Sequence, residues 1–132
     1  MKTIEDYRTL PEGQTFDRKS ARIEPKALAV IMVAMANADG GTIAIGIEDD
    51  GSVSGIDRYS THINDLLRVP FDYCIPSINV HPQRIACTDK EGKENHILIL
   101  DVEQSSSMHS TTADDSYYRV GDKPKKLSFD DR

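Results

Sequence analysis

The clearest hydrophobic pattern of the chain lies in the segment Pro25–Ala38. Apolar side chains recur there at intervals of three and four residues, which is typical of a helix that buries one face. These side chains are Leu28, Ile31, Met32 and Met35. Pro25 suits the first turn of a helix, where its missing N–H is not needed. Gly40 suits the left-handed position just after the last turn. We therefore predict a helix over Pro25–Ala38 that ends before a double glycine.

Two other segments are almost entirely apolar and predict the central strands of a sheet. Thr42–Ile47 and Ile97–Val102 show little alternation between polar and apolar positions. A strand covered on both faces has this pattern, whereas a strand with one solvent face alternates. The second of these lies within a longer predicted strand, and residues 89–94 read as a polar hairpin loop before it. That longer strand is Asn95–Val102. The other predicted strands are Thr15–Lys19, Ile78–Thr88 and Tyr117–Val120.

Glycines mark two predicted turns beside the strand Thr42–Ile47. Asp50-Gly51 stands between this strand and Ser52–Ile56, which predicts a hairpin with a tight primed turn, because such turns need positive φ angles. Gly40-Gly41 precedes the strand. This pair follows a helix, whose C-terminal end carries partial negative charge, so it does not suit a phosphate-binding loop. We interpret it as a tight helix-to-strand turn.

The rest of the chain predicts one more helix and one mobile loop. Thr61–Arg68 has an apolar face and a candidate cap at Ser60 or Thr61, and Pro70 ends or bends the helix. Gln104–Asp115 is rich in serine and threonine and has almost no side chain to bury. A segment of this composition is expected to be a mobile loop.

Strands that mix with two main helices and several hairpins indicate an α+β (mixed α/β) fold. The expected architecture is a mixed, mostly antiparallel sheet packed with two main helices. The length of 132 residues suits a single compact domain over residues 1–132. At the end of the chain, Ser128–Asp131 has the S-x-x-D form with which helices begin. We therefore expect the domain to be the N-terminal part of a longer protein.

Composition narrows the function classes. No apolar run approaches the length that crosses a membrane, and the first residues do not form a signal peptide, so we expect a cytoplasmic protein. Cys74 and Cys87 show no metal-binding spacing and are interpreted as reduced thiols. The formal net charge of −6 argues against an extensive basic surface of the kind that binds nucleic acid tightly. A local basic patch is still compatible with this charge.

Basic and aromatic residues gather in two clusters, one near the predicted strand Thr15–Lys19 and one near the C-terminus. If the two clusters meet in space, they form a phosphate-binding patch with tyrosines that stack on bases. The alternative is ordinary solvated charge, and Arg119 has the further alternative of pairing with a carboxylate of the acidic turn. The candidate nucleic-acid-binding residues are Arg18, Lys19, Arg22, Lys26, Tyr118, Arg119, Lys123, Lys125 and Lys126.

Three blocks of the sequence together resemble a known family. Ala34–Ile56 contains a helix end, A-x-A-N-A-x-G-G-T, an apolar strand, an acidic turn and G-x-x-x-G-I-like spacing. Glu12–Ser20 looks like an E-S-x-x-x-E-F-K-x-S segment, and Ser116–Gly121 looks like a Y-x-R-x-G segment. Their order is similar to that of the Schlafen-type AlbA-like family. The resemblance covers Glu12 to the end of the chain, and it implies DNA binding, often within a transcriptional regulator.

The same resemblance implies a candidate catalytic site. Glu12, Asp17 and Glu48 stand where some family members place three acidic residues that bind divalent metal for RNA cleavage, and Lys19 follows in an acid-x-lysine pattern. Clustered carboxylates suit Mg²⁺ or Mn²⁺, which polarises a phosphate and activates water, while a lysine stabilises the developing charge. The alternative is that Asp17 and Lys19 lie on a solvated strand face and that Glu48 belongs to a simple turn.

Three hypotheses for function therefore stand side by side. The first is a DNA- or RNA-binding module, as the family resemblance implies. The second is a divalent-metal-dependent ribonuclease, which the acid-x-lysine pattern favours. The third is a self-associating scaffold, for example a homodimer, that acts together with a further C-terminal region of the same protein. The acidic net charge favours the third hypothesis over the first.

Overall fold

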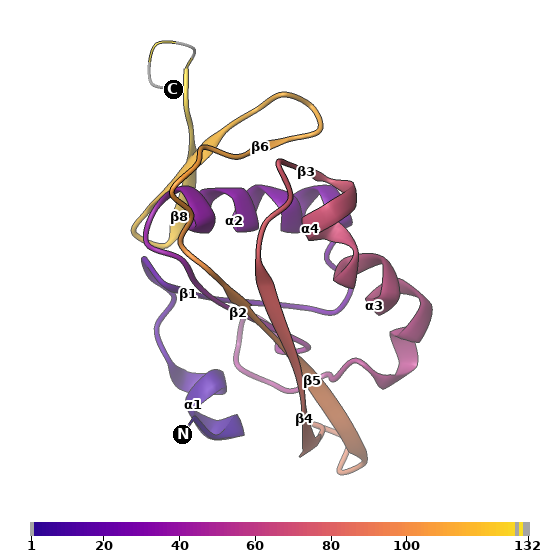
Figure 1. The fold of residues 1–132 in the computed structure, drawn as a ribbon. Helices are drawn as coiled ribbons and strands as arrows, with labels where there is room; N and C mark the ends of the chain where they lie inside the picture. The colour runs from indigo at the N-terminus through magenta and orange to yellow at the C-terminus, as the bar shows by residue number, and fades with distance from the viewer. Residues whose placement is uncertain (1, 129, 131–132) are drawn as a thin grey trace.

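A four-stranded sheet in the order β1-β2-β5-β4 forms the centre of the computed structural model, which describes residues 2–128 and 130 (Figure 1). β1 and β2 run parallel, and the other neighbours are antiparallel, so the expected mixed and mostly antiparallel sheet is confirmed. The fold is that of a single α+β domain. The strands are β1 (Phe16–Lys19), β2 (Gly41–Ile45), β4 (Val80–Thr88) and β5 (Glu94–Val102).

Helices cover both faces of this sheet. α2 (Pro25–Asn37) connects β1 to β2, and its predicted apolar stripe is buried against side chains of β2 and β5. α1 (Ile4–Thr9) lies against the opposite face, where Tyr7 is buried in a second cluster (Figure 1). Because β2 and β5 are covered on both sides, they bury side chains of both parities, which confirms that they are central strands.

Gly40 ends α2 as the sequence predicts. Its N–H donates to the carbonyl of Met35 at 2.7 Å, and its φ angle is +74°. A Cβ atom at this position would lie 2.8 Å from the carbonyl oxygen of Val102. Only glycine satisfies both the left-handed backbone and the close approach to β5.

The acidic turn forms, but the predicted hairpin does not extend beyond it. The N–H of Glu48 donates to the carbonyl of Ser52 at 2.9 Å, and Gly51 is at φ +86°. Asp50 has no positive φ, so the connection is a longer turn closed by one left-handed glycine rather than a primed turn. After the turn, a single bridge between Ile47 and Val53 replaces the expected second strand.

The second helical region is divided into pieces. A 3₁₀ turn over Asp57–Tyr59 leads into α3 (Ser60–Leu67), and α4 (Val69–Asp72) follows with Pro70 in its first turn. Proline is accepted there because its missing N–H would have no partner. The predicted caps at Ser60 and Thr61 are wrong, since the residue before α3 is Tyr59, and it makes no side-chain cap bond.

Gln104–Asp115 is a loop over most of its length, as predicted, but it contains a short strand and a buried side chain. β6 (Ser110–Thr111) pairs with β3 (Cys74–Ile75), and His109 is buried. The amide of Asn37, in the last turn of α2, donates to the carbonyl of His109 at 3.0 Å and accepts from its N–H at 2.8 Å. Hydrogen bonds hold this segment in place, and few of its side chains are apolar. Its hydropathy pattern therefore did not indicate that it is held.

A separate two-stranded hairpin packs against α2. β7 (Tyr117–Val120) is the predicted last strand, and β8 (Lys123–Lys126) pairs with it antiparallel. The sequence analysis interpreted Lys123–Lys126 only as a basic run, because lysine and proline are poor strand formers. The predicted helix start at Ser128–Asp131 involves Phe129 and Asp131, which lie outside the described residues. In the described part of the chain, no helix has the length and apolarity needed to cross a membrane.

Candidate nucleic-acid interface

The strand β1 directs Asp17 into the interior, where it meets an arginine from the other end of the chain. Arg119 Nη1 donates to Asp17 Oδ2 at 2.9 Å, and the two side chains are only 0% and 4% exposed. Arg119 also donates through Nε and Nη2 to the carbonyl of Gly13, at 3.1 and 2.9 Å. Arg119 is therefore a buried link between β7 and β1, and it is not available to bind nucleic acid.

This position of Arg119 corrects two expectations. It pairs with Asp17 of β1 and not with a carboxylate of the acidic turn. Gln14 strengthens the same link, since its Nε2 donates to the carbonyl of Arg119 at 2.6 Å and its Oε1 accepts from the N–H of Gly121 at 2.8 Å. Sequence analysis did not single out Gln14, although it lies inside the block that resembles the family motif.

Arg18 is also inside the protein. Its Nε donates to the carbonyl of Tyr7 at 3.1 Å, and its Nη2 donates to the carbonyl of Leu10. The guanidinium lies 5.0 Å from the ring centre of Phe16, in a cation–π contact. Arg18 thus joins α1 to β1, and the prediction that it contacts phosphate is wrong for this structure.

Glu12 and Asp17, two of the three predicted metal ligands, lie together. The pKa of Glu12 is raised, first because its carboxyl hydrogen-bonds that of Asp17 and second because it loses hydration. Asp17 Oδ1 is buried and finds no hydrogen-bond donor among the described residues, and Lys19 Nζ lies 3.5 Å from it as an ion pair. Protonation of Glu12 would relieve the repulsion between the two carboxylates.

The third predicted ligand, Glu48, has other partners. Arg22 Nη2 donates to its Oε1 at 2.8 Å, and Ser54 Oγ donates to its Oε2 at 2.6 Å. Partial burial by itself would raise the pKa of Glu48, but these two hydrogen bonds outweigh it and the pKa is lowered. Within residues 2–128 and 130, no three His, Cys, Asp or Glu side chains are arranged to hold a metal ion. The expected three-carboxylate centre is therefore not formed.

Two of the remaining basic residues line a groove between β1, α2 and the β7–β8 hairpin. Lys19 lines this groove from β1 and Lys123 lines it from β8, with Asp17 and Asp122 beside them. Ile23, Ala27, Val30 and Ile31 form its apolar floor. Arg22 and Lys26 are exposed nearby in sequence, on the approach to α2 and in its first turn. The structure thus brings Lys19 and Lys123, one from each predicted basic cluster, to one groove.

The outer face of the β7–β8 hairpin continues this surface. Tyr118 pairs with Lys125 and Val120 pairs with Lys123, so these four residues share one face of the hairpin. Tyr118 and Val120 are 40% and 57% exposed. Lys126 lies on the opposite face and forms an ion pair with Asp115, with 3.2 Å between Nζ and Oδ1.

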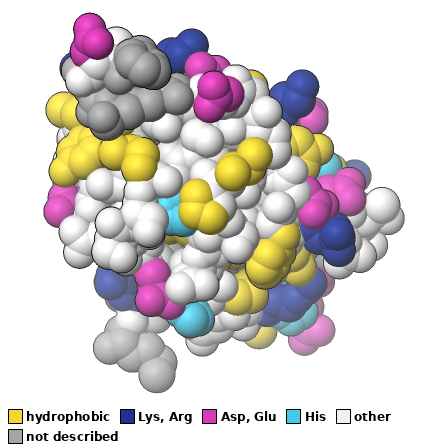
Figure 2. All heavy atoms as spheres, turned by 45° about the horizontal axis from the view of Figure 1, so that its top comes forward, with side chains coloured by type: hydrophobic (Ala, Val, Ile, Leu, Met, Phe, Trp, Pro, Cys, Tyr) yellow, Lys and Arg dark blue, Asp and Glu magenta, His cyan; other side chains and the backbone are white. Residues whose placement is uncertain are grey.

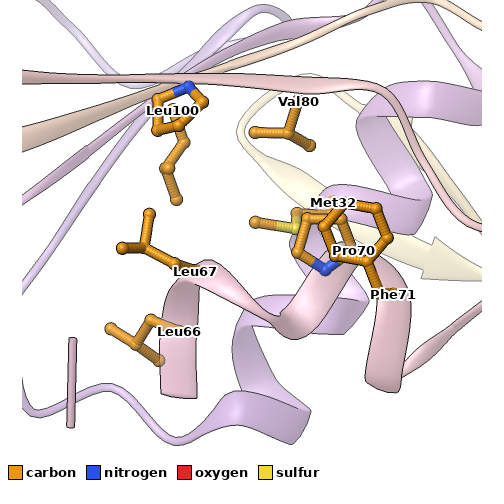
Figure 3. A pocket seen from close by; sticks show the side chains of 8 residues that line it. Met32, Leu66, Leu67, Pro70, Phe71, Val80 and Leu100 are labelled. Carbon is orange, nitrogen blue, oxygen red and sulfur yellow. The ribbon is translucent and has the colours of Figure 1, made fainter. Parts of the chain in front are cut away.

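A different hollow lies between the α3–α4 region and the edge of the sheet, and its walls are apolar. Figure 3 shows Val80 and Leu100 across this hollow from Leu67 and Pro70. Phe71 stands at its rim and is 70% exposed. No charged side chain lines this hollow in the part of the chain that the structure describes, so its chemistry suits an apolar ligand or side chain.

Comparison with known proteins identifies relatives of this chain at the level of family and fold. A model of the family described as Schlafen, AlbA_2 matches residues 12–128. The crystal structure of the DIP2311 protein from Corynebacterium diphtheriae is similar, with a TM-score of 0.57 and 24% sequence identity. The similarity covers 86% of this chain but 25% of that one, so this chain spans about a quarter of its length. No curated protein matches.

Proposed function

Because this chain belongs to the Schlafen, AlbA_2 family, we propose that it is a nucleic-acid-binding domain, with DNA as the first candidate ligand and a transcriptional regulator as its setting. The sugar-phosphate backbone lies in the groove between β1, α2 and the β7–β8 hairpin. The observation that supports this proposal most directly is the meeting of Lys19 and Lys123 at that groove. Two lysines that line one groove, contributed by different strands, suit contacts to a chain of phosphates.

The charge of the molecule sets the strength of binding that we expect. The net charge is −6, and Asp17 and Asp122 line the same groove as the two lysines. Repulsion from these acids offsets part of the attraction to phosphate. Binding is therefore weak, sequence-independent and strongly dependent on salt, because released counterions supply most of the free energy of such contacts.

Fluorescence anisotropy with labelled DNA and RNA oligonucleotides tests the proposal. Titrations at about 50 and about 200 mM salt give the dependence of affinity on salt. The double variant Lys19→Gln/Lys123→Gln should bind more weakly and lower the salt slope by about 2, one for each lost phosphate contact. The matched control Lys90→Gln/Lys93→Gln removes two exposed lysines from the β4–β5 loop and should bind like the wild type. Equal losses in both variants, or tight binding that ignores salt, would contradict the proposal.

One observation keeps a metal-dependent ribonuclease as the second candidate. The Glu12–Asp17 pair lies beside the groove, and Lys19 is within ion-pair distance of Asp17. One or two carboxylates together with substrate phosphates are a usual ligand set for Mg²⁺. RNA incubated with Mg²⁺ or Mn²⁺ should then be cleaved by the wild type and not by Glu12→Gln. Cleavage that survives this substitution would exclude the pair from catalysis.

A further inference from the structure

A second hollow lies next to the basic groove, and Val30 of α2 belongs to the walls of both. The walls of this hollow come from α2, from the residue after α4, from the segment that follows β6, and from the start of β7. Its volume is about 220 Å³. Pockets for drug-sized ligands are larger, at about 300–1,000 Å³, so this hollow suits a single flat ring system.

Two tyrosines give the hollow its apolar walls. Tyr73 and Tyr117 both line it, and both pack against the main hydrophobic core on their inner side. Their backbones are fixed as well, because the N–H of Thr112 donates to the carbonyl of Tyr73 at 3.1 Å and Asn37 donates to the carbonyl of Tyr117 at 2.9 Å. Aromatic walls that are already held in place bind a flat ligand at little cost in conformational entropy.

Charged groups stand around the rim of the hollow. Lys26 lines it and is exposed, and it is in the first turn of the helix that also borders the groove. Asp115 also lines it, and Lys126 Nζ lies 3.2 Å from its Oδ1 in an ion pair. The rim thus offers a cation to a phosphate and a carboxylate oxygen to an N–H group, while the interior is apolar. A nucleotide has this combination of a charged phosphate, a polar ring edge and an apolar ring face.

We propose that this hollow holds one unstacked base of a single-stranded nucleic acid whose backbone lies in the adjacent groove. The inference rests on the proposed function, and it adds the class of ligand: a single strand in preference to a duplex. A base within a duplex is stacked and paired on both sides, whereas a base in a single strand turns out without breaking pairs. Tyr73 and Tyr117 contact the ring face, and Lys26 contacts the flanking phosphate.

An oligonucleotide without bases separates this inference from the proposed function. The probes are a fluorescent single-stranded deoxyadenosine oligomer, an abasic oligomer of the same length and charge, and a duplex that contains the first strand. The wild type should bind the base-containing strand about 5- to 150-fold more tightly than the abasic strand, which is the range expected for stacking of one base. The duplex should bind about as weakly as the abasic strand.

A matched pair of variants locates the effect. Ala113→Leu extends an exposed side chain that lines the hollow and occupies it without an aromatic face. Ala86→Leu makes the same change at an exposed position of β4, away from the hollow. The first variant should lose the preference for bases, and the second should keep it in full.

The outcomes distinguish the two proposals. If the wild type binds base-containing and abasic strands equally and with the same salt dependence, the base pocket is overturned and backbone binding stands. If Ala113→Leu keeps the preference for bases, the pocket is overturned even though stacking occurs elsewhere. If no probe binds at low salt, both proposals fail together.

Discussion

At the scale of single residues, the ion pair between Asp17 and Arg119 is the contact on which the site depends. Both side chains are inside the protein, and Arg119 spans from β7 to the carbonyl of Gly13 and to Asp17. A buried charge that loses its partner is costly because neither water nor another carboxylate replaces it. The pair therefore positions the β7–β8 hairpin, and with it Lys123, beside β1.

We expect Asp17→Asn to destabilise the domain by about 3–5 kcal/mol, the usual effect of leaving a buried charge unpaired. Urea unfolding followed by circular dichroism measures this. Lys19→Gln is the control, since it removes the other, partly exposed partner of Asp17 and should cost less than about 1 kcal/mol. An unchanged urea midpoint for Asp17→Asn would show that the pair does not stabilise the fold. Because Asp17→Asn is expected to destabilise the fold itself, a loss of metal binding in this variant would not show that Asp17 is a ligand.

The carboxyl pair predicts a dependence of stability on pH. The folded state raises the pKa of Glu12 above its usual value of 4.5. Between pH 4.5 and this raised pKa, the folded protein therefore binds more protons at Glu12 than the unfolded chain does. This contribution to stability is present below pH 4.5 and is lost as the pH rises through the raised pKa.

Glu12→Gln keeps the hydrogen-bonding shape of the side chain without its ionisation. It should match the wild type in acid and become more stable than the wild type at neutral pH. The gain should stay below about 1 kcal/mol, because the Glu12 side chain is largely exposed and water screens its interaction with Asp17. Unfolding curves at several pH values test this, and a variant less stable than the wild type at neutral pH would contradict it.

At the scale of elements, the end of α2 organises the segment that follows β5. Asn37 makes three hydrogen bonds through its amide, to both backbone groups of His109 and to the carbonyl of Tyr117. His109 in turn has its Nδ1 2.7 Å from the carbonyl oxygen of Pro76. One polar residue at a helix end thereby holds the segment before the β7–β8 hairpin and one wall of the proposed base pocket.

We expect Asn37→Ala to release this segment. Three lost hydrogen bonds correspond to about 1.5–4.5 kcal/mol if each contributes its usual amount. Limited proteolysis should then cut the variant between residues 104 and 115 under conditions that leave the wild type intact. Ser52→Ala, a change in the acidic turn at a half-buried residue that makes no hydrogen bond to the 104–115 segment among the described contacts, serves as the control. Cleavage at the same rate in wild type and Asn37→Ala would mean that the amide does not hold the segment.

At the scale of the whole molecule, charge is distributed in small groups. On the face in Figure 2, basic side chains are scattered among acidic ones and do not merge into one continuous area. Steering of nucleic acid from a distance needs a broad positive field, and a chain with a net charge of −6 does not provide it. Under the proposed function, recognition would depend on a few local contacts at the groove and its neighbouring hollow and not on total charge.

The arrangement of the carboxylates also predicts the response to metal. Glu48 is bound to Arg22 and Ser54, so of the three predicted ligands Glu12 and Asp17 are left to ligate a cation near the groove. We expect millimolar Mg²⁺ or Mn²⁺ to leave the melting temperature within about 1 °C of its metal-free value, because weak binding adds little stability by mass action. Thermal unfolding with and without metal tests this. A larger rise that Glu12→Gln abolishes would support the ribonuclease hypothesis instead.

Association of two copies of this chain remains a prediction. The apolar hollow with Phe71 at its rim is the surface that a second copy would cover. The scaffold hypothesis expects a dimer that Phe71→Ser converts to a monomer in sedimentation velocity experiments, without a change in nucleic-acid binding. A wild type that sediments as a monomer at high concentration would remove the support for this hypothesis.

The sequence by itself determined the framework of this protein. The spacing of apolar residues identified α2 and its buried face, and unbroken apolar runs identified β2 and β5 as central strands. Motif blocks identified the family. A helix and a central strand are recognised from the spacing of apolar residues that are close in sequence. Such local patterns can be read without knowing the contacts between distant segments.

Only the tertiary structure decided which charged residues face solvent, which are buried, and which lie next to one another. Arg18 and Arg119 look like surface cations in the sequence, yet their partners are backbone carbonyls and a carboxylate contributed by distant segments. Lys19 and Lys123 share a groove because Arg119 and Gln14 join β7 to the chain around β1 and because the hairpin packs against α2. The side chain of an arginine or lysine is compatible with either environment, so its role depends on the long-range contacts that the folded chain makes available.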